Sequence, residues 1–382
     1  MNLADVLIDE ILKLNQENLE SLKAHLDKNE KKASWAFCLG AGVSISCGFP
    51  DWAKLLSMIN GKILKSYSQS YDPKNKWLNI MAEAIQETMK NNEFVDKMEG
   101  VANGNAANSY SGVDLLEFAE YIRAMIRGQL GIDDENLING VLREYIHGCY
   151  NAQYDSDGRI IGYDDSTLEA VVEAMKKREI RRAITYNYDD LLEIALKSDK
   201  NEVESIVPED QKEFSIDDGI YKIYHCHGLV PVNATADDGK GEASKIILTE
   251  TSYYNEESCN YSLANALQAY SMNYCNLIYV GFSGADYTFR RIIRGMNQNE
   301  DKINHYIFFC LDDIVNMIYG GTDKEMDKKD FIERIKDKNG KYDYERLMIN
   351  QMVVSKTLYW EDKGMKVIWS THDELPKVLK DL

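Results

Sequence analysis

Six short apolar runs, each followed by glycine or polar residues, constrain the fold more than any other feature of the sequence. Each run has the length of a buried strand, and the residues after it have the composition of a turn. A parallel α/β sheet produces this pattern because its ligands bind beyond the carboxyl ends of its strands. We therefore expect an α/β fold with a Rossmann-like parallel sheet of about six strands. The runs are 34–39, 181–185, 220–225, 276–280, 306–311 and 366–369.

Two other parts of the chain have helical periodicity. Residues 1–32 carry apolar residues at helical spacing with charges between them, which predicts an N-terminal amphipathic helix. This helix can pack on its own domain or on a neighbouring subunit. Residues 33–382 make the sheet-containing domain, and the interval from about 53 to 180 has few strand signals. We expect a helical insertion over that interval.

The composition limits the location and the partners of the chain. Of its 382 residues, 44% are hydrophobic and 28% are charged, which is typical of a globular protein. No apolar run reaches the roughly 18–20 residues that a membrane span needs. The seven cysteines are scattered without a CxxC pair, as is typical of reduced thiols, and the net charge of −19 repels nucleic acid and anionic membranes. We expect a cytoplasmic protein that binds neither a membrane nor, directly, a nucleic acid.

The first apolar run leads into a turn of small residues at 40–52. Glycines directly after a strand let the backbone approach a pyrophosphate, and the helix that follows offers unpaired amides to it. Tight turns also select glycine without any ligand, and the spacing is neither that of the dehydrogenase fingerprint nor that of the P-loop. The candidate cofactor-binding residues in this turn are Gly40, Ala41, Gly42, Ser44, Pro50 and Asp51.

Polar residues also follow the run 181–185. Asn187 and Asp189 come directly after this predicted strand. Both residue types bind ligands at such strand ends, but both are also common helix caps, and a helix is expected to begin near Asp190. The sequence leaves these two interpretations open.

Two later strand ends carry further candidates. His227 follows the run 220–225 and precedes a glycine, while Gly281 and Ser283 follow the run 276–280. His225 lies close to His227, and either histidine can be a core residue instead of a catalytic one. Ser283 can end a strand without touching a ligand.

Four of these motifs occur in the order found in sirtuins, and together they resemble that family. They are GAGVSISCGFPDW at 40–52, TYNYD at 185–189, His227-Gly228 and Gly281-Phe282-Ser283. The resemblance covers residues 33–52, 180–290 and 305–382, and it implies an NAD-binding domain.

The resemblance and the chemistry of the nicotinamide bond assign a role to each candidate. His227 would act as the base, either directly on water or through a ribose hydroxyl, and Asn187 would position the attacking water. Asp189 would orient the nicotinamide carboxamide. The glycine turn would meet the phosphates, while Ser283 and the strand end near Ser370 would face the adenosine.

One departure from deacetylating sirtuins is informative. Those proteins carry two CxxC pairs for a structural zinc between the histidine and the later glycine-serine motif. In this interval the chain has only Cys259 and Cys275, which are far apart in sequence. We therefore expect no zinc module, and we expect the acceptor to be a small molecule such as water.

The segments 246–249, 253–254 and 280–286 look like those of sirtuin-like effectors of bacterial antiphage systems. That branch includes domains that work with Thoeris proteins, short Argonautes or HerA-type ATPases, and it implies NAD degradation. Because an unregulated NAD hydrolase would kill its host, we expect control by assembly or by a partner protein. The expected partners are other copies of the chain and a separately encoded protein such as a HerA-type ATPase.

The leading hypothesis is thus an NAD glycohydrolase that releases nicotinamide and ADP-ribose. Nicotinamide leaves as a neutral molecule from a cationic precursor, so no general acid is needed. The alternatives are a non-catalytic module that binds NAD or ADP-ribose, and an ADP-ribosyltransferase. Asp286 is interpreted as a surface partner of Arg290 and Arg291, and His372 as a residue at a helix start outside the site.

Overall fold

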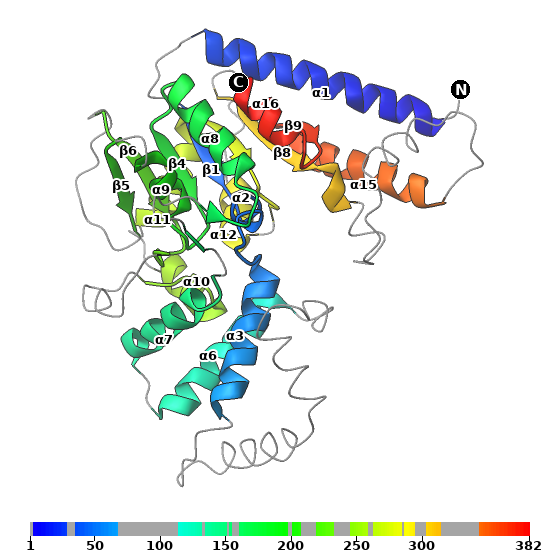
Figure 1. The fold of residues 1–382 in the computed structure, drawn as a ribbon. Helices are drawn as coiled ribbons and strands as arrows, with labels where there is room; N and C mark the ends of the chain where they lie inside the picture. The colour runs from blue at the N-terminus through cyan, green and yellow to red at the C-terminus, as the bar shows by residue number, and fades with distance from the viewer. Residues whose placement is uncertain are drawn as a thin grey trace.

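The computed structural model shows a parallel sheet flanked by helices, with a separate helical layer beyond one end of the sheet (Figure 1). The predicted boundary between residues 32 and 33, much of the insertion (68–113) and Cys259 lie outside the described residues. The structure describes residues 3–28, 35–67, 114–131, 134–150, 153–154, 160–197, 201–207, 219–232, 245–258, 263–284, 286–294, 303–314 and 344–382.

The sheet has seven strands, all parallel, in the order β5-β6-β4-β1-β7-β8-β9. Without β5 this is the strand order 3-2-1-4-5-6 of the dinucleotide-binding fold. The prediction of a Rossmann-like parallel sheet of about six strands is confirmed. The strands are β1 (Trp35–Leu39), β4 (Arg182–Thr185), β5 (Val203–Ile206), β6 (Tyr221–His225), β7 (Asn276–Val280), β8 (His305–Cys310) and β9 (Met365–Ser370).

The two faces of the sheet bury two different cores. Side chains alternate between the faces along each strand, so in β1 Phe37 and Leu39 enter one core while Ala36 and Cys38 enter the other. Helices α8 (Ser166–Lys177), α9 (Leu191–Lys197) and α16 (Leu375–Lys380) cover the first face. Helices α11 (Leu263–Tyr274), α12 (Tyr287–Arg294) and α15 (Tyr344–Glu361) cover the second face. Both faces are therefore covered, as a parallel sheet requires.

Helix α1 (Leu3–Asp27) covers the β9 edge of the sheet. Asn15 donates to the carbonyl of Trp369 at 3.0 Å and accepts from the amide of Trp369 at 2.6 Å. Asn18 donates to the carbonyl of Val367 at 2.9 Å. These side chains pair backbone groups that an edge strand would otherwise expose. Of the two packing partners left open by the sequence, α1 therefore uses its own domain.

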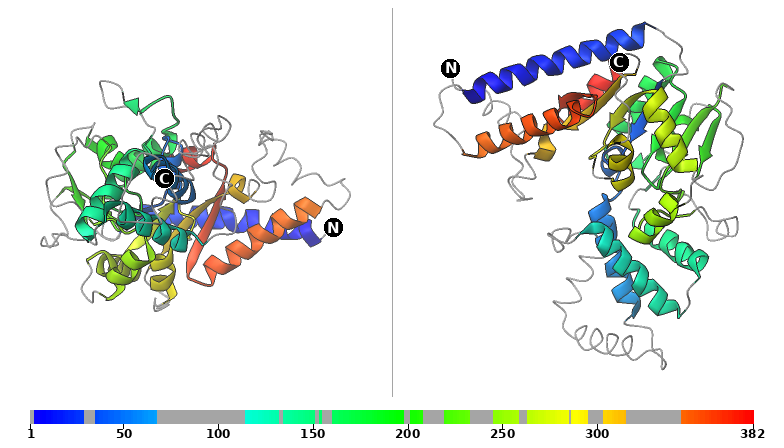
Figure 2. Two further views of the ribbon diagram at one scale, coloured as in Figure 1. Left: turned by 90° about the horizontal axis from the view of Figure 1, so that it is seen from below. Right: turned by 180° about the vertical axis from the view of Figure 1, so that it is seen from behind.

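The helical layer consists of α3 (Trp52–Tyr67), α6 (Leu115–Leu130) and α7 (Glu135–His147). These helices share a third core, which also contains Val230, Ile246 and Leu248 from the segments after β6. In Figures 1 and 2 the layer lies beyond the strand ends, next to α10 (Glu250–Ser258). Helix α8 also falls within the interval 53–180, but it packs on α9 and α16 against the sheet.

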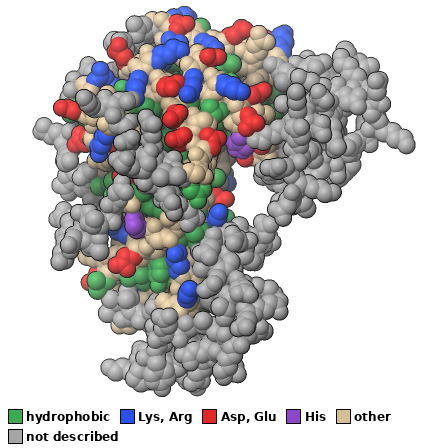
Figure 3. Space-filling view, viewed as in Figure 1, with side chains coloured by type: hydrophobic (Ala, Val, Ile, Leu, Met, Phe, Trp, Pro, Cys, Tyr) green, Lys and Arg blue, Asp and Glu red, His purple; other side chains and the backbone are tan. Residues whose placement is uncertain are grey.

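Small elements complete the described chain. They are α2 (Gly42–Ile45) and the hairpin of β2 (Gln153–Tyr154) and β3 (Ile160–Ile161). Acidic and basic side chains are interspersed on the described part of the face in Figure 3. No helix among the described residues is both long enough and apolar enough to cross a membrane.

Candidate functional site

The glycine turn after β1 meets the glycine turn after β7 at the point where the strand order reverses. The amide of Gly40 donates to the carbonyl of Val280 at 3.1 Å, and the amide of Gly42 donates to the carbonyl of Gly281 at 2.9 Å. A Cβ on Gly42 would lie 2.7 Å from the Cα of Gly281, and Gly281 itself has a φ of +63°. Glycine is therefore required here by the close approach of the two turns. In open α/β sheets this reversal point is where ligands bind.

The start of α2 differs from the expectation of unpaired amides. The amides of Gly42, Val43 and Ser44 donate to the carbonyls of Gly281, Gly40 and Ala41. A pyrophosphate bound at this turn must therefore replace protein carbonyls as the acceptor of some of these amides. The turn also offers the side chain of Ser44, which is buried.

Asn187 connects the end of β4 to the glycine turn. Its side-chain nitrogen donates to the carbonyl of Gly40 at 3.1 Å and to the Ser44 hydroxyl at 2.9 Å. Its backbone amide donates to the Thr185 hydroxyl at 3.1 Å. The Asn187 side chain is thus directed at the β1 turn and does not cap α9. The structure brings Asn187, Gly40 and Ser44 together.

Asp189, in contrast, is a helix cap. Its carboxylate accepts from the amide of Leu191, the first residue of α9, at 3.3 Å. Burial raises the pKa of Asp189 to about 6, although hydrogen bonds from Ser44 and Leu191 act in the opposite direction. A buried carboxylate with a raised pKa costs stability when it is ionised. Capping alone does not require that cost, because asparagine caps helices equally well.

His225 is enclosed between two hydrogen-bond acceptors. Its Nε2 lies 2.6 Å from the carboxylate of Glu193, and its Nδ1 lies 3.3 Å from the carbonyl of Asn187. Since both partners only accept, both ring nitrogens must carry hydrogen. Burial alone would lower the pKa of His225, but Glu193 and the Asn187 carbonyl raise it. His225 is therefore a buried cation without a lone pair to act as a base, and it holds the backbone of Asn187.

His227 has a different environment. Its Nε2 lies 3.2 Å from the Asp286 carboxylate and 3.3 Å from the Tyr253 hydroxyl. The Tyr253 hydroxyl in turn donates to Asp286 at 2.9 Å. Among the residues that the structure describes, none hydrogen-bonds its Nδ1, and the imidazole is buried.

The structure contradicts the interpretation of Asp286 as a surface residue. It was expected to pair with Arg290 and Arg291 on a helix surface, but its side chain is only 11% exposed and faces His227. Its other oxygen accepts from the amide of Phe289 at 2.7 Å. Burial alone would raise the pKa of Asp286, but the charge and hydrogen bond of His227 hold it below the usual range, assisted by Phe289 and Tyr253.

Asn187 and His227 follow the ends of neighbouring strands. Thr185 pairs with His225 across β4 and β6, so each candidate stands two residues after the last paired residue of its strand. The ring of His227 packs against Tyr186 and Tyr188, with centroids 5.2 and 6.3 Å apart. The side chains of Asn187 and His227 nevertheless have separate hydrogen-bond partners.

The remaining candidates lie around this centre. Asp51 is exposed and accepts from the amide of Lys54 at 2.7 Å, so it caps α3, while Pro50 and Ala41 are half-buried. Ser283 is exposed beside Gly281 in the β7 turn. At the end of β9 the buried Ser370 hydroxyl has no hydrogen-bond partner within the described residues.

Another polar cluster lies at the ends of β8 and β9. The ligand atoms of Cys310, Asp313 and His372 lie within 4.8 Å of one another, an arrangement that can hold a metal ion. Hydrogen bonds with Asp313 and Cys310 raise the pKa of His372 to about 10. At neutral pH the ring therefore carries a proton, which competes with a metal. His372 precedes α16 (Leu375–Lys380), as expected from the sequence.

The family comparison covers the centre of the site. A comparison with curated proteins finds no match. Residues 181–339 match a family model described as a SIR2-like domain, and this segment contains Asn187, His227, Asp286 and the β7 turn. The match supports the sirtuin-like resemblance of the sheet domain, whereas the glycine turn after β1 and the helical layer lie outside it.

Proposed function

We propose that the chain is an NAD glycohydrolase, in which water replaces nicotinamide at the anomeric carbon of the ribose. The observation that carries this proposal is the position of Asn187. It connects β4 to the β1 turn through Gly40 and Ser44, and His227 follows the end of the neighbouring strand β6. A polar amide and an imidazole at the reversal point of a dinucleotide-type sheet suit the handling of a ribose and a water molecule.

The residues have the following roles in the proposed reaction. The bond between the anomeric carbon and the nicotinamide nitrogen breaks, and nicotinamide leaves as a neutral molecule. A bond forms to the oxygen of water, and the proton of that water passes to the free nitrogen of His227 and then to solvent. The Asn187 amide holds the attacking water. The products are nicotinamide, ADP-ribose and a proton.

The two glycine turns would hold the pyrophosphate. Binding requires some of the Gly42, Val43 and Ser44 amides to exchange a protein carbonyl for a phosphate oxygen. Ser44, Pro50 and Asp51 are further candidates for cofactor binding, while Gly281, Ser283 and the β9 end would face the adenosine. Asp189 would orient the carboxamide.

Incubation of the full chain with NAD and chromatography of the products test the proposal. We expect free nicotinamide and ADP-ribose, and we expect Asn187→Ala and His227→Ala to lower the rate of their formation strongly while both variants stay folded. Unchanged NAD that binds the protein would indicate a binding module, and a labelled macromolecule would indicate ADP-ribosyl transfer. Activity that survives both substitutions contradicts the site assignment.

We also propose that the protein acts in the cytoplasm as an antiphage effector controlled by assembly. The motifs shared with sirtuin-like effectors support this role, and a HerA-type ATPase or further copies of the chain are the proposed partners. Purified chain should then show low activity alone and higher activity in a larger assembly. Size-exclusion chromatography coupled to the NAD assay, with and without the partner, tests this control. Equal activity in all fractions contradicts it.

A further inference from the structure

The imidazole of His227 is held by two residues that the proposed reaction does not itself require. Ionised carboxylates only accept hydrogen bonds, so the His227 Nε2 that lies 3.2 Å from Asp286 carries a hydrogen. In the neutral ring the lone pair is then on Nδ1. A carboxylate that fixes a histidine tautomer determines which nitrogen can accept a proton.

Asp286 is itself fixed in place. One carboxylate oxygen accepts from the amide of Phe289 at 2.7 Å, at the start of α12. The other oxygen accepts from the Tyr253 hydroxyl at 2.9 Å and faces His227. Both oxygens are therefore engaged, and the side chain cannot rotate without breaking a charge-assisted hydrogen bond.

Tyr253 comes from α10, which also contacts the helical layer. Its side chain is buried, and its ring packs edge-on against His227 with centroids 5.4 Å apart. The position of α10 therefore sets the position of the Tyr253 hydroxyl relative to Asp286 and His227.

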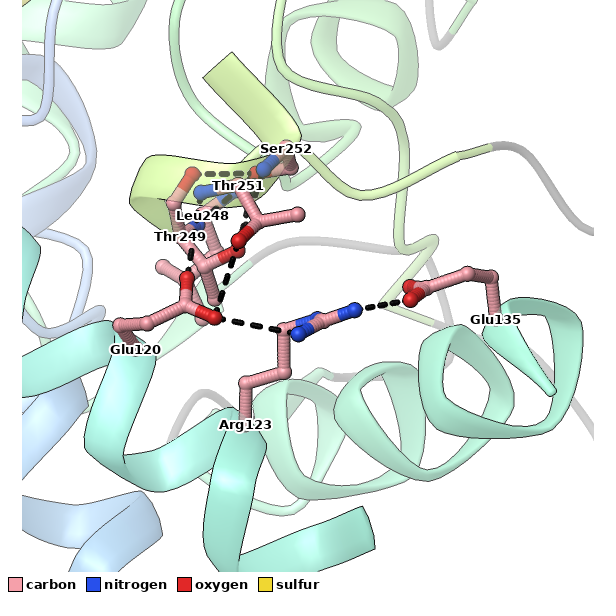
Figure 4. Close-up of polar contacts among 7 residues, drawn as sticks. All are labelled: Glu120, Arg123, Glu135, Leu248, Thr249, Thr251 and Ser252. Atoms are coloured by element: carbon pink, nitrogen blue, oxygen red, sulfur yellow. Dashed lines mark hydrogen bonds and ion pairs between the residues drawn. The ribbon is translucent and has the colours of Figure 1, made fainter. Parts of the chain in front are cut away.

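The first turn of α10 is anchored twice (Figure 4). Within the segment, Ser252 accepts from the amides of Leu248 and Thr249 at 3.0 and 2.9 Å, and Thr249 accepts from the amide of Ser252 at 3.2 Å. These reciprocal bonds satisfy amides at a helix start.

The second anchor comes from α6 of the helical layer. The Glu120 carboxylate accepts from the amide of Thr251 at 3.1 Å and from its hydroxyl at 3.0 Å. Arg123 pairs with Glu120 at 3.1 Å and also with Glu135 of α7. The Glu120 carboxylate is therefore held by Arg123 in addition to Thr251. Glu120 lies on the helical layer, while Tyr253 lies two residues after Thr251.

We propose that Asp286 and Tyr253 are positioning residues for His227, and that Glu120 transmits the position of the helical layer to them through α10. This inference rests on the proposed function only for its activity readouts. The helical layer would then help to determine the position of the His227 imidazole.

The first test replaces the two positioning residues. Asp286→Asn keeps the acceptor for the Phe289 amide but removes the negative charge, and Tyr253→Phe removes only the hydroxyl. We expect kcat for NAD hydrolysis to fall on the order of 10-fold to 100-fold while KM stays within about twofold. Tyr254→Phe is the matched control, because this neighbour on α10 is 66% exposed; it should leave both constants unchanged. A loss confined to KM overturns the positioning role.

A second measurement does not depend on NAD. Nitrogen NMR of protein labelled at its six histidines reports which nitrogen of His227 carries hydrogen, and His227→Ala identifies the signal. We expect hydrogen on Nε2 in the wild type and a mixture of tautomers in Asp286→Asn. If the wild type has this tautomer but does not hydrolyse NAD, the proposed function fails and the positioning role stands. An unchanged signal in Asp286→Asn overturns the positioning role.

A double-mutant cycle tests the connection to the helical layer. Glu120→Ala should lower kcat by about twofold to tenfold, and the Glu120→Ala, Tyr253→Phe double variant should lose no more than Tyr253→Phe alone. Glu117→Gln, an exposed glutamate on the same helix, is the control and should behave as the wild type. Additive losses in the double variant overturn the connection, as does an unchanged kcat in Glu120→Ala.

Discussion

His225 and His227 lie two residues apart at the end of the same strand, and each pairs with a buried carboxylate, yet they differ in what their second nitrogen meets. The second nitrogen of His225 faces the Asn187 carbonyl, whereas Nδ1 of His227 has no hydrogen-bond partner among the described residues. The side chains of His225 and Glu193 are 0% and 2% exposed, against 9% and 11% for His227 and Asp286. One pair is therefore suited to hold the backbone, and the other to exchange a proton.

The partners also come from different sides of the sheet. Glu193 belongs to α9, which packs on the first face, and it also accepts from Ser205 of the edge strand β5 at 2.8 Å. Asp286 precedes α12, which packs on the second face. The same residue chemistry therefore serves stability on one face and, in our proposal, catalysis on the other.

The largest expected effect separates the two histidines by activity. His227→Ala should lower kcat by about 10² to 10⁴, because it removes the base, and the protein should stay folded because Asp286 keeps its hydrogen bonds from the Phe289 amide and the Tyr253 hydroxyl. His225→Ala should unfold or strongly destabilise the protein, since it leaves Glu193 as a buried, unpaired carboxylate. NAD hydrolysis and thermal unfolding of both variants check this. A His225→Ala protein that is stable but inactive contradicts the comparison.

The next effect separates the two carboxylates by stability. Glu193→Gln leaves the His225 cation buried without a counter-charge, which should lower the free energy of unfolding by about 3–5 kcal/mol. Denaturant unfolding at pH 7 measures it, with the exposed Glu169→Gln on α8 as the control. The less enclosed Asp286→Asn should cost less. If Asp286→Asn is the more destabilising of the two variants, the Glu193 pair is not the one that stabilises the fold more.

The pH dependence of the Glu193 contribution has a defined sign. Burial alone would raise the pKa of Glu193, but the charge of His225 lowers it, as do the hydrogen bonds that Glu193 accepts from His225 and Ser205. A depressed carboxylate pKa stabilises the fold above the unfolded value and loses that stability as pH falls through the folded value. The raised pKa of His225 stabilises the fold at low pH and loses that stability as pH rises through the folded value. The excess stability of the wild type over Glu193→Gln should therefore peak between these limits and decline on both sides.

Much of the sheet was accessible from sequence. The apolar runs predict six strands because those strands are buried on both faces. Strand β5 (Val203–Ile206) escapes this criterion because it is a half-buried edge strand that contains Glu204 and Ser205. A four-residue segment with two polar residues between its apolar ends is not distinguishable from a loop by sequence alone.

The side-chain pairings were not accessible from sequence. Asp286 stands three residues before Phe289 at a helix start, so its local pattern predicts a cap, which it also is. Its contact with His227 arises only when β6 and β7 bring their ends to the same edge. Gly228, which singled out His227, has a φ of +93°, and a Cβ there would lie 3.1 Å from the carbonyl carbon of Lys245 and closer still to its carbonyl oxygen. That glycine is therefore required by the backbone, whatever the role of the histidine.

A smaller effect concerns Asp189, whose ionised carboxylate lowers the free energy of unfolding. Its raised pKa of about 6 means that the folded state favours the protonated form, so the penalty is absent below about pH 4 and grows as pH rises through 6. Asp189→Asn keeps the α9 cap and should raise the free energy of unfolding at pH 7.5 by about 2–3 kcal/mol, with little change at pH 4. Denaturant unfolding of the wild type and Asp189→Asn at the two pH values measures this difference. An equal increase in the free energy of unfolding at both pH values would show that the charge of Asp189 is not the cause.

The smallest effect comes from the third histidine and carboxylate pair, which is exposed. His372 and Asp313 lie 3.1 Å apart with side chains 49% and 59% exposed. The pKa of His372 is raised to about 10, so this pair stabilises the fold below the unfolded value of about 6.5 and loses that contribution as pH rises toward 10. Solvent screening limits the gain to below about 1 kcal/mol.

Asp313→Asn should flatten the decline of unfolding free energy between pH 7 and 10, and 1 M salt should flatten it equally in the wild type. By contrast, salt should barely change the Glu193 contribution, because buried pairs are screened much less. If salt weakens both pairs alike, burial does not distinguish them.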